Sequence, residues 1–86
     1  MEKSIQHESV CKMIHEVYLQ KNEEYGDSFG ELYDELGDMS ALTQVLHKVN
    51  RAKQIVKNGG DLEDTVLDLA NYAIMWYMEI GGKHDS

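Results

Sequence analysis

The segment Asp61–Ile80, which reads DLEDTVLDLANYAIMWYMEI, decides the fold of this chain. Its apolar side chains recur with the helical period and cover well over half of a cylinder, so this helix must be buried on most sides. The rest of the cylinder is polar in an ordered way, because spacings of three, four and three residues place four polar side chains in one stripe: Asp61, Asp64, Asp68 and Asn71. Carboxylates beside a core are costly unless a divalent cation, basic side chains or water neutralise them.

The spacing of apolar residues in the rest of the chain also predicts helices, and no segment alternates apolar and polar residues as a half-buried strand does. Glycines mark the turns between them, at 26–30, 59–60 and 81–82. Ser28 with Glu31 forms a capping-box pattern at the start of a short second helix, and Ser40 is expected to open the third. We therefore expect one all-α domain over residues 1–86, a four-helix bundle with helices over 4–22, 28–36, 40–57 and 61–80.

The turn at residues 58–60 predicts that the third and fourth helices are antiparallel neighbours. If so, Val49 and Val56 of the third helix should share one core with Val66 and Ala73 of the fourth. The fourth helix also carries more apolar surface than three short helices can cover. We therefore expect a homo-oligomer, a dimer or a larger assembly, with Trp76, Tyr77 and Met78 as interface anchors.

Composition narrows the range of functions. The net charge of -8 would repel a phosphate backbone, so direct nucleic-acid binding is not expected. No apolar run approaches the length of a membrane span, and the N-terminus lacks the apolar stretch of a signal peptide. A single cysteine, Cys11, cannot form an internal disulfide. These features favour a cytoplasmic protein without a membrane partner.

Basic residues gather in the third helix, where four of the eight Lys and Arg residues lie within ten positions: Lys48, Arg51, Lys53 and Lys57. Cations near a helix C-terminus are ordinary complements of the helix dipole. Lys48 and Arg51 lie further from that end, so a second interpretation is that they face an anionic ligand. Lys21, at the end of the first helix, allows the same two interpretations.

Two segments resemble a known family: KNEEYGDSF (Lys21–Phe29) and EDTVLDLANYAIM (Glu63–Met75), with HKVNR (His47–Arg51) between them. They are similar to the small phage and bacterial domain called nucleotide modification associated domain 1. More distantly, the helix order and acidic clusters resemble the MazG-like all-α nucleotide pyrophosphohydrolases. Members of that superfamily hold Mg²⁺ with paired carboxylates on two antiparallel helices and split a nucleoside triphosphate between its first two phosphates.

The resemblance implies a site residue by residue. Asp61 and Asp64 stand at the two acidic positions of the superfamily's E-x-x-D motif, and Asn71 matches the asparagine two turns on. The expected Mg²⁺ ligands are Asp64, Asp68, Glu31, Glu35 and Asp61, since hard cations prefer oxygen ligands. The expected nucleotide-binding residues are Lys21, Tyr25, Lys48, Arg51 and Asn71. No catalytic residue is assigned, and the sequence leaves open whether the protein is an enzyme.

Three hypotheses about the function are compatible with the sequence. The protein could be a Mg²⁺-dependent nucleotide pyrophosphohydrolase, with a small nucleotide as substrate. It could instead be a phage-type binding protein that sequesters a nucleotide, such as a host defence signal, without cleaving it. The third hypothesis is an acidic inhibitor that imitates nucleic acid and occupies a basic groove on a host protein. The ordered stripe on the fourth helix favours a defined site over a diffuse charged face.

Overall fold

The structure is a computed structural model that describes the backbone of residues 2–84 and the side chains as far as Gly82. It contains four helices, α1 (Lys3–Tyr25), α2 (Ser28–Leu36), α3 (Asp38–Asn58) and α4 (Leu62–His84). No strand occurs within residues 2–84, so the all-α prediction is confirmed. The bounds of α2 agree with the prediction, whereas the other helices extend one to four residues beyond the predicted C-terminal ends. The expectation that Ser40 opens the third helix is wrong, because α3 already begins at Asp38 after Gly37.

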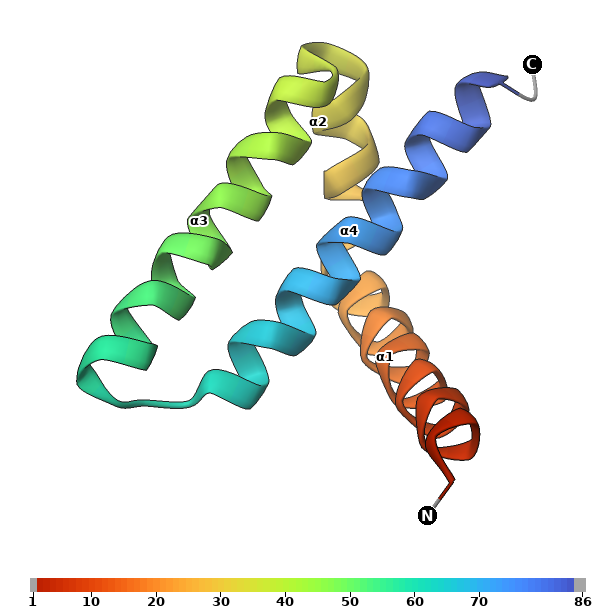
Figure 1. Cartoon of the computed structure of the whole chain (residues 1–86). Coiled ribbons are helices and arrows are strands. Elements are labelled where there is room, and N and C mark those ends of the chain that lie inside the picture. The colour runs from red at the N-terminus through yellow and green to blue at the C-terminus, as the bar shows by residue number, and fades with distance from the viewer. Residues whose placement is uncertain (1, 85–86) are drawn as a thin grey trace.

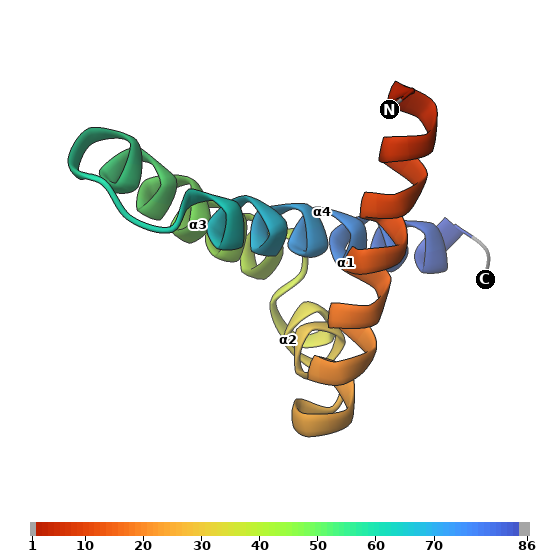
Figure 2. The same ribbon diagram turned by 90° about the horizontal axis from the view of Figure 1, so that it is seen from below.

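Helix α4 is the element that holds the others together. It packs against α1, α2 and α3, and its most extensive packing is against α3. These two helices form the predicted antiparallel pair, joined by the short turn at Gly59 and Gly60 (Figure 1). Helix α1 lies across α4 instead of alongside it, and α2 lies beneath the end of this pair (Figure 2). The result is an open arrangement, in which the hairpin of α3 and α4 projects away from the other two helices.

Local interactions explain where the helices begin and end. Gly26 and Gly37 have φ angles of 67° and 68°, a left-handed conformation that side chains disfavour, and they end α1 and α2. The Asp27 carboxylate accepts a hydrogen bond from the Gly30 backbone N–H at 3.1 Å. Asp27 is therefore the cap of α2, and the predicted capping role of Ser28 is wrong because Ser28 already lies inside the helix.

The buried core lies at one end of the hairpin. Phe29 and Tyr33 of α2 and Ala41 of α3 are buried, and three partly buried side chains of α4 pack against them: Tyr72, Met75 and Trp76. The predicted core of Val49, Val56, Val66 and Ala73 is wrong, since Val56 is 73% and Val66 49% exposed. The nine-residue α2 covers only the end of the hairpin that carries Ala41, so the end near Gly59 has no third helix over it.

The Asp38 carboxylate accepts hydrogen bonds from two side chains of this core. Oδ1 of Asp38, in the first turn of α3, accepts a hydrogen bond from the Tyr33 hydroxyl at 2.6 Å and another from Nε1 of Trp76 at 2.9 Å. The Tyr33 side chain is buried, and its hydrogen bond to Asp38 raises its pKa to about 12. Helices α2, α3 and α4 are therefore joined through a single polar group that all three share.

Much of the apolar surface of α4 stays exposed in one chain, in contrast to the expected burial on most sides. Tyr77 is 77%, Met78 52% and Ile74 47% exposed. No helix in the described part of the chain is long and apolar enough to span a membrane. This apolar surface is compatible with self-association, and the expected homo-oligomer stays a prediction.

Candidate functional site

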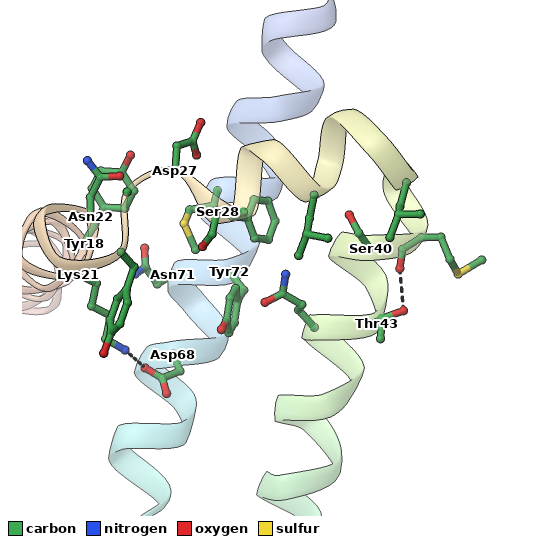
Figure 3. A pocket seen from close by; sticks show the side chains of 18 residues that line it. Tyr18, Lys21, Asn22, Asp27, Ser28, Ser40, Thr43, Asp68, Asn71 and Tyr72 are labelled. Atoms are coloured by element: carbon green, nitrogen blue, oxygen red, sulfur yellow. Dashed lines mark hydrogen bonds and ion pairs between the residues drawn. The ribbon is translucent and has the colours of Figure 1, made fainter.

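A pocket of about 630 Å³ lies where the end of α1 and the following turn face α2, the start of α3 and the middle of α4. Figure 3 shows side chains from these helices converging on one space, with Asp68, Asn71 and Tyr72 of α4 between the side chains of α1 and those of α3. The lining combines aromatic and apolar groups with polar ones: Tyr18, Lys21, Asn22, Tyr25, Gly26, Asp27, Ser28, Phe29, Leu32, Leu36, Met39, Ser40, Thr43, Gln44, Asp68, Asn71, Tyr72 and Met75. Pockets of this size and mixed character are the usual sites for small ligands.

Two lysines share one carboxylate on the pocket wall. Nζ of Lys21 lies 3.2 Å from Oδ1 of Asp68, and Nζ of Lys48 lies 3.0 Å from Oδ2 of the same residue (Figure 3 shows the first pair). The side chains of Asp68 and Lys48 are each 17% exposed, whereas that of Lys21 is 54% exposed. The Lys48 pair is therefore the better shielded of the two, and Lys21 is the more accessible cation.

Burial raises the pKa of Asp68, but the hydrogen bonds from Lys48 and Lys21 outweigh it and hold the pKa below its ordinary value. The hydrogen bond to Asp68 likewise raises the pKa of Lys21, against a smaller effect of burial. Asp68 and Lys21 are thus both charged at neutral pH. The Lys48 ammonium, which pairs with the same carboxylate, lies beside them. They place two positive charges and one negative charge at this wall.

Next to these charges lie an aromatic surface and a buried amide. The Lys48 ammonium is 6.0 Å from the centroid of the Tyr72 ring, whose other neighbour is Phe29 at 6.0 Å between centroids. Asn71 is only 8% exposed, and its side chain makes no hydrogen bond to any other residue that the structure describes. No side-chain N or O atom of the described residues is both buried and without a partner, so the unpaired Asn71 amide keeps some accessible surface. Because Asn71 lines the pocket, its amide can donate to and accept from a ligand there.

The structure brings together only part of the set predicted from the sequence. Lys21, Tyr25, Asp68 and Asn71 line the pocket, and Lys48 reaches it through Asp68. Arg51 is exposed on α3 and does not line it. The Asp61 carboxylate accepts a hydrogen bond from the Asp64 backbone N–H at 3.1 Å, so Asp61 caps the N-terminus of α4.

The predicted Mg²⁺ ligands are not gathered. Glu31, Glu35, Asp61 and Asp64 are exposed and lie outside the pocket, and Asp68 is already engaged by two ammonium groups. Among residues 2–84 no group of three or more His, Cys, Asp or Glu side chains is placed to hold a metal ion. The described residues of one chain therefore do not fit a Mg²⁺ site, and Mg²⁺ binding stays a prediction that needs carboxylates from elsewhere.

Several lining residues were missed from the sequence, among them Tyr18, Gln44 and Tyr72. Tyr18 repeats with Val10, Ile14 and Val17 at the helical period, a pattern that indicates packing against another helix and not a binding site. The available signal was spacing: Gln44 precedes Lys48 by four residues, and Tyr72 follows Asp68 by four, so each shares a helix face with a charged site residue. A helix face that combines a charge with an amide or an aromatic ring is a better indicator here than charge alone.

The fold and pocket define a small all-α domain with a mixed aromatic and cationic cavity. The chain belongs to the nucleotide modification associated domain 1 family, whose profile matches residues 21–80. The matched segment begins at Lys21 and includes Asp68, Asn71 and Tyr72, so it covers most of the pocket. Neither the curated proteins nor the solved structures gave a significant match to this chain.

Proposed function

We propose that the pocket between α1 and α4 binds a nucleotide. The observation that carries this proposal is the combination in the pocket lining of the Lys21 ammonium, the Tyr72 ring and the Asn71 amide, with the Lys48 ammonium held beside them by Asp68. A nucleotide offers a partner for each: an anionic group for an ammonium, a flat base for an aromatic ring and a polar base edge for an amide.

The family name supports a nucleotide over other small anions, because it associates this domain with nucleotide modification. The expected MazG-like pyrophosphohydrolase activity is a finer proposal. It would need the acidic groups of α2 and α4 around one Mg²⁺, and one chain does not gather them. We therefore propose binding as the activity of the pocket, with hydrolysis as a separate question for experiment.

Sequestration of a nucleotide signal is compatible with this proposal, since it needs only a pocket. Imitation of nucleic acid by an acidic surface draws its support from the net charge of -8 alone. It gives no role to the paired lysines, which lie at a cavity instead of on the acidic surface. Nucleotide binding is thus the function that uses the features of the pocket.

Isothermal titration calorimetry with the common ribonucleotides and deoxynucleotides tests the proposal, with chromatography of each mixture to detect cleavage. The informative variant is Asn71→Ala, and its matched control is Asn50→Ala, an exposed amide of α3 outside the pocket. Asn71→Ala should weaken binding roughly tenfold, because it leaves a polar group of the ligand without a partner, and Asn50→Ala should bind like the parent. If the parent, Asn71→Ala and Asn50→Ala bind the nucleotide with equal affinity, the nucleotide does not bind in this pocket.

A further inference from the structure

The charges around the pocket nearly cancel. Its charged lining residues are Lys21, Asp27 and Asp68, and Lys48 completes the set through its ion pair with Asp68. Two ammonium groups therefore stand against two carboxylates. Asp64 lies close enough for its charge to act on Lys21, and the whole chain carries a net charge of -8. The pocket has no excess of positive charge to offer a highly charged ligand.

Only one of these cations is available to a ligand without breaking a shielded pair. Lys48 is 17% exposed and bonded to an equally shielded Asp68, whereas Lys21 is 54% exposed at the end of α1. If Lys21 turns toward a ligand, Asp68 keeps Lys48 as its partner, so no buried charge is left unpaired. The Lys48 pair can thus persist while Lys21 changes partners.

The rest of the lining suits the uncharged part of a nucleotide. Tyr18, Tyr25, Phe29 and Tyr72 supply aromatic surface, and the amides of Asn22, Gln44 and Asn71 supply donors and acceptors. A triphosphate would bring several more negative charges than a monophosphate, which carries about -1.5 to -2 at neutral pH. A bound Mg²⁺ could neutralise these extra charges, but the described residues include no group of three or more acidic, His or Cys side chains placed to hold one.

We infer that this pocket selects a nucleoside 5′-monophosphate over the corresponding triphosphate, with Lys21 exchanging Asp68 for the single phosphate. This inference rests on the proposed nucleotide-binding function and names its ligand class. It assigns Lys21 the contact to phosphate, and it assigns Asp68 the role of holding Lys48 whether or not a ligand is bound.

Calorimetric titration of the four standard deoxynucleosides, their 5′-monophosphates and their 5′-triphosphates tests this inference, first with a chelator and then with Mg²⁺. The preferred monophosphate should bind roughly tenfold more tightly than its triphosphate in both conditions, because the pocket has no excess positive charge and the net charge of -8 on the chain repels the two additional phosphates. A triphosphate that binds as tightly as its monophosphate, in either condition, overturns the inference but leaves nucleotide binding intact. If no compound of this panel binds and the ribonucleotides do not bind either, the proposed function fails together with the inference.

The variant Lys21→Ala separates the phosphate contact from the base contacts, with Lys12→Ala as its control. Lys12 lies on the same helix and pairs with Glu8 at 3.4 Å, and neither residue lines the pocket. Lys21→Ala should weaken the monophosphate roughly tenfold and leave the nucleoside unchanged, since only the monophosphate carries the anion. Equal loss for both ligands, or no loss for either, would show that Lys21 does not hold the phosphate.

Discussion

The Lys21 ammonium and the Asp68 carboxylate lie 3.2 Å apart and join residues that are 47 positions apart in the chain. This contact connects the last turns of α1 to the middle of α4, where α1 crosses it. Asp68 also binds Lys48 at 3.0 Å, so it links three helices at the wall of the pocket. The same carboxylate therefore contributes to both the fold and the candidate site.

Asp68→Asn should destabilise the protein by about 1–3 kcal/mol, because the amide leaves the shielded Lys48 ammonium without a countercharge. Chemical denaturation followed by circular dichroism measures this. Asp64→Asn is the matched control on the same helix, since Asp64 is exposed and its side chain has no ion pair among the described residues. A metal site built on these carboxylates predicts the opposite, namely that either substitution preserves or raises the melting temperature without metal.

Alkaline stability should depend on Tyr33. Its pKa is raised from 10.0 to about 12 by the hydrogen bond to Asp38, so the neutral hydroxyl is the form that stabilises the fold. Its contribution is complete below pH 10 and is lost as the pH rises toward 12. Melting temperatures measured across this range should fall for the parent, and the part of the fall that is due to this hydroxyl should be absent in Tyr33→Phe. Tyr77→Phe, at an exposed tyrosine, should behave like the parent.

The homo-oligomer prediction concerns the exposed apolar side chains of α4. Multi-angle light scattering at micromolar concentration should give a mass above the 9.9 kDa of one chain. Met78→Glu should shift the protein toward the monomer, since it places a charge on a surface that is 52% exposed in one chain. A parent mass near 9.9 kDa would contradict the prediction, because it would show that the apolar side chains of α4 stay exposed in a monomer.

Overpacking at Ala41 should show how closely the helices approach at the core. Ala41 is fully buried beside Phe29 and Tyr33, and larger side chains in a packed core typically cost about 1–3 kcal/mol. Ala41→Leu should therefore lower the melting temperature clearly, whereas Thr43→Leu, at an exposed position two residues on, should change it little. Equal melting temperatures for both variants would mean that the approach of α2 to α3 is looser than described.

The sequence predicted the helices well because periodicity and the glycine turns at residues 26 and 59–60 are local signals. The expected turn at residues 81–82 is wrong, since α4 continues through both glycines to His84. The sequence also placed Asp68 and Asn71 in one polar stripe, and both line the pocket. The same stripe includes Asp61 and Asp64, which lie outside it, because Asp61 caps α4 and the pocket faces only the middle of that helix.

The predicted valine core failed for a different reason. Periodicity tells which residues share a helix face, but not which helix covers that face. Val56 and Val66 lie near the hairpin turn, beyond the reach of the short α2, and only the three-dimensional arrangement shows this. Likewise, the crossing of α1 over α4 brings Tyr18 and Lys21 to the pocket, and no local pattern predicts a crossing.

Side-chain amide resonances report whether a nucleotide occupies the pocket between α1 and α4. In a ¹⁵N-labelled sample titrated with a deoxynucleoside monophosphate, the NH₂ signals of Asn71 and Gln44 should shift, because both side chains line the pocket. Those of Asn50 and Gln54, on α3 outside it, should stay in place. Shifts confined to Asn50 and Gln54, with Asn71 and Gln44 unmoved at saturation, would contradict the account and place the ligand on the basic surface of α3.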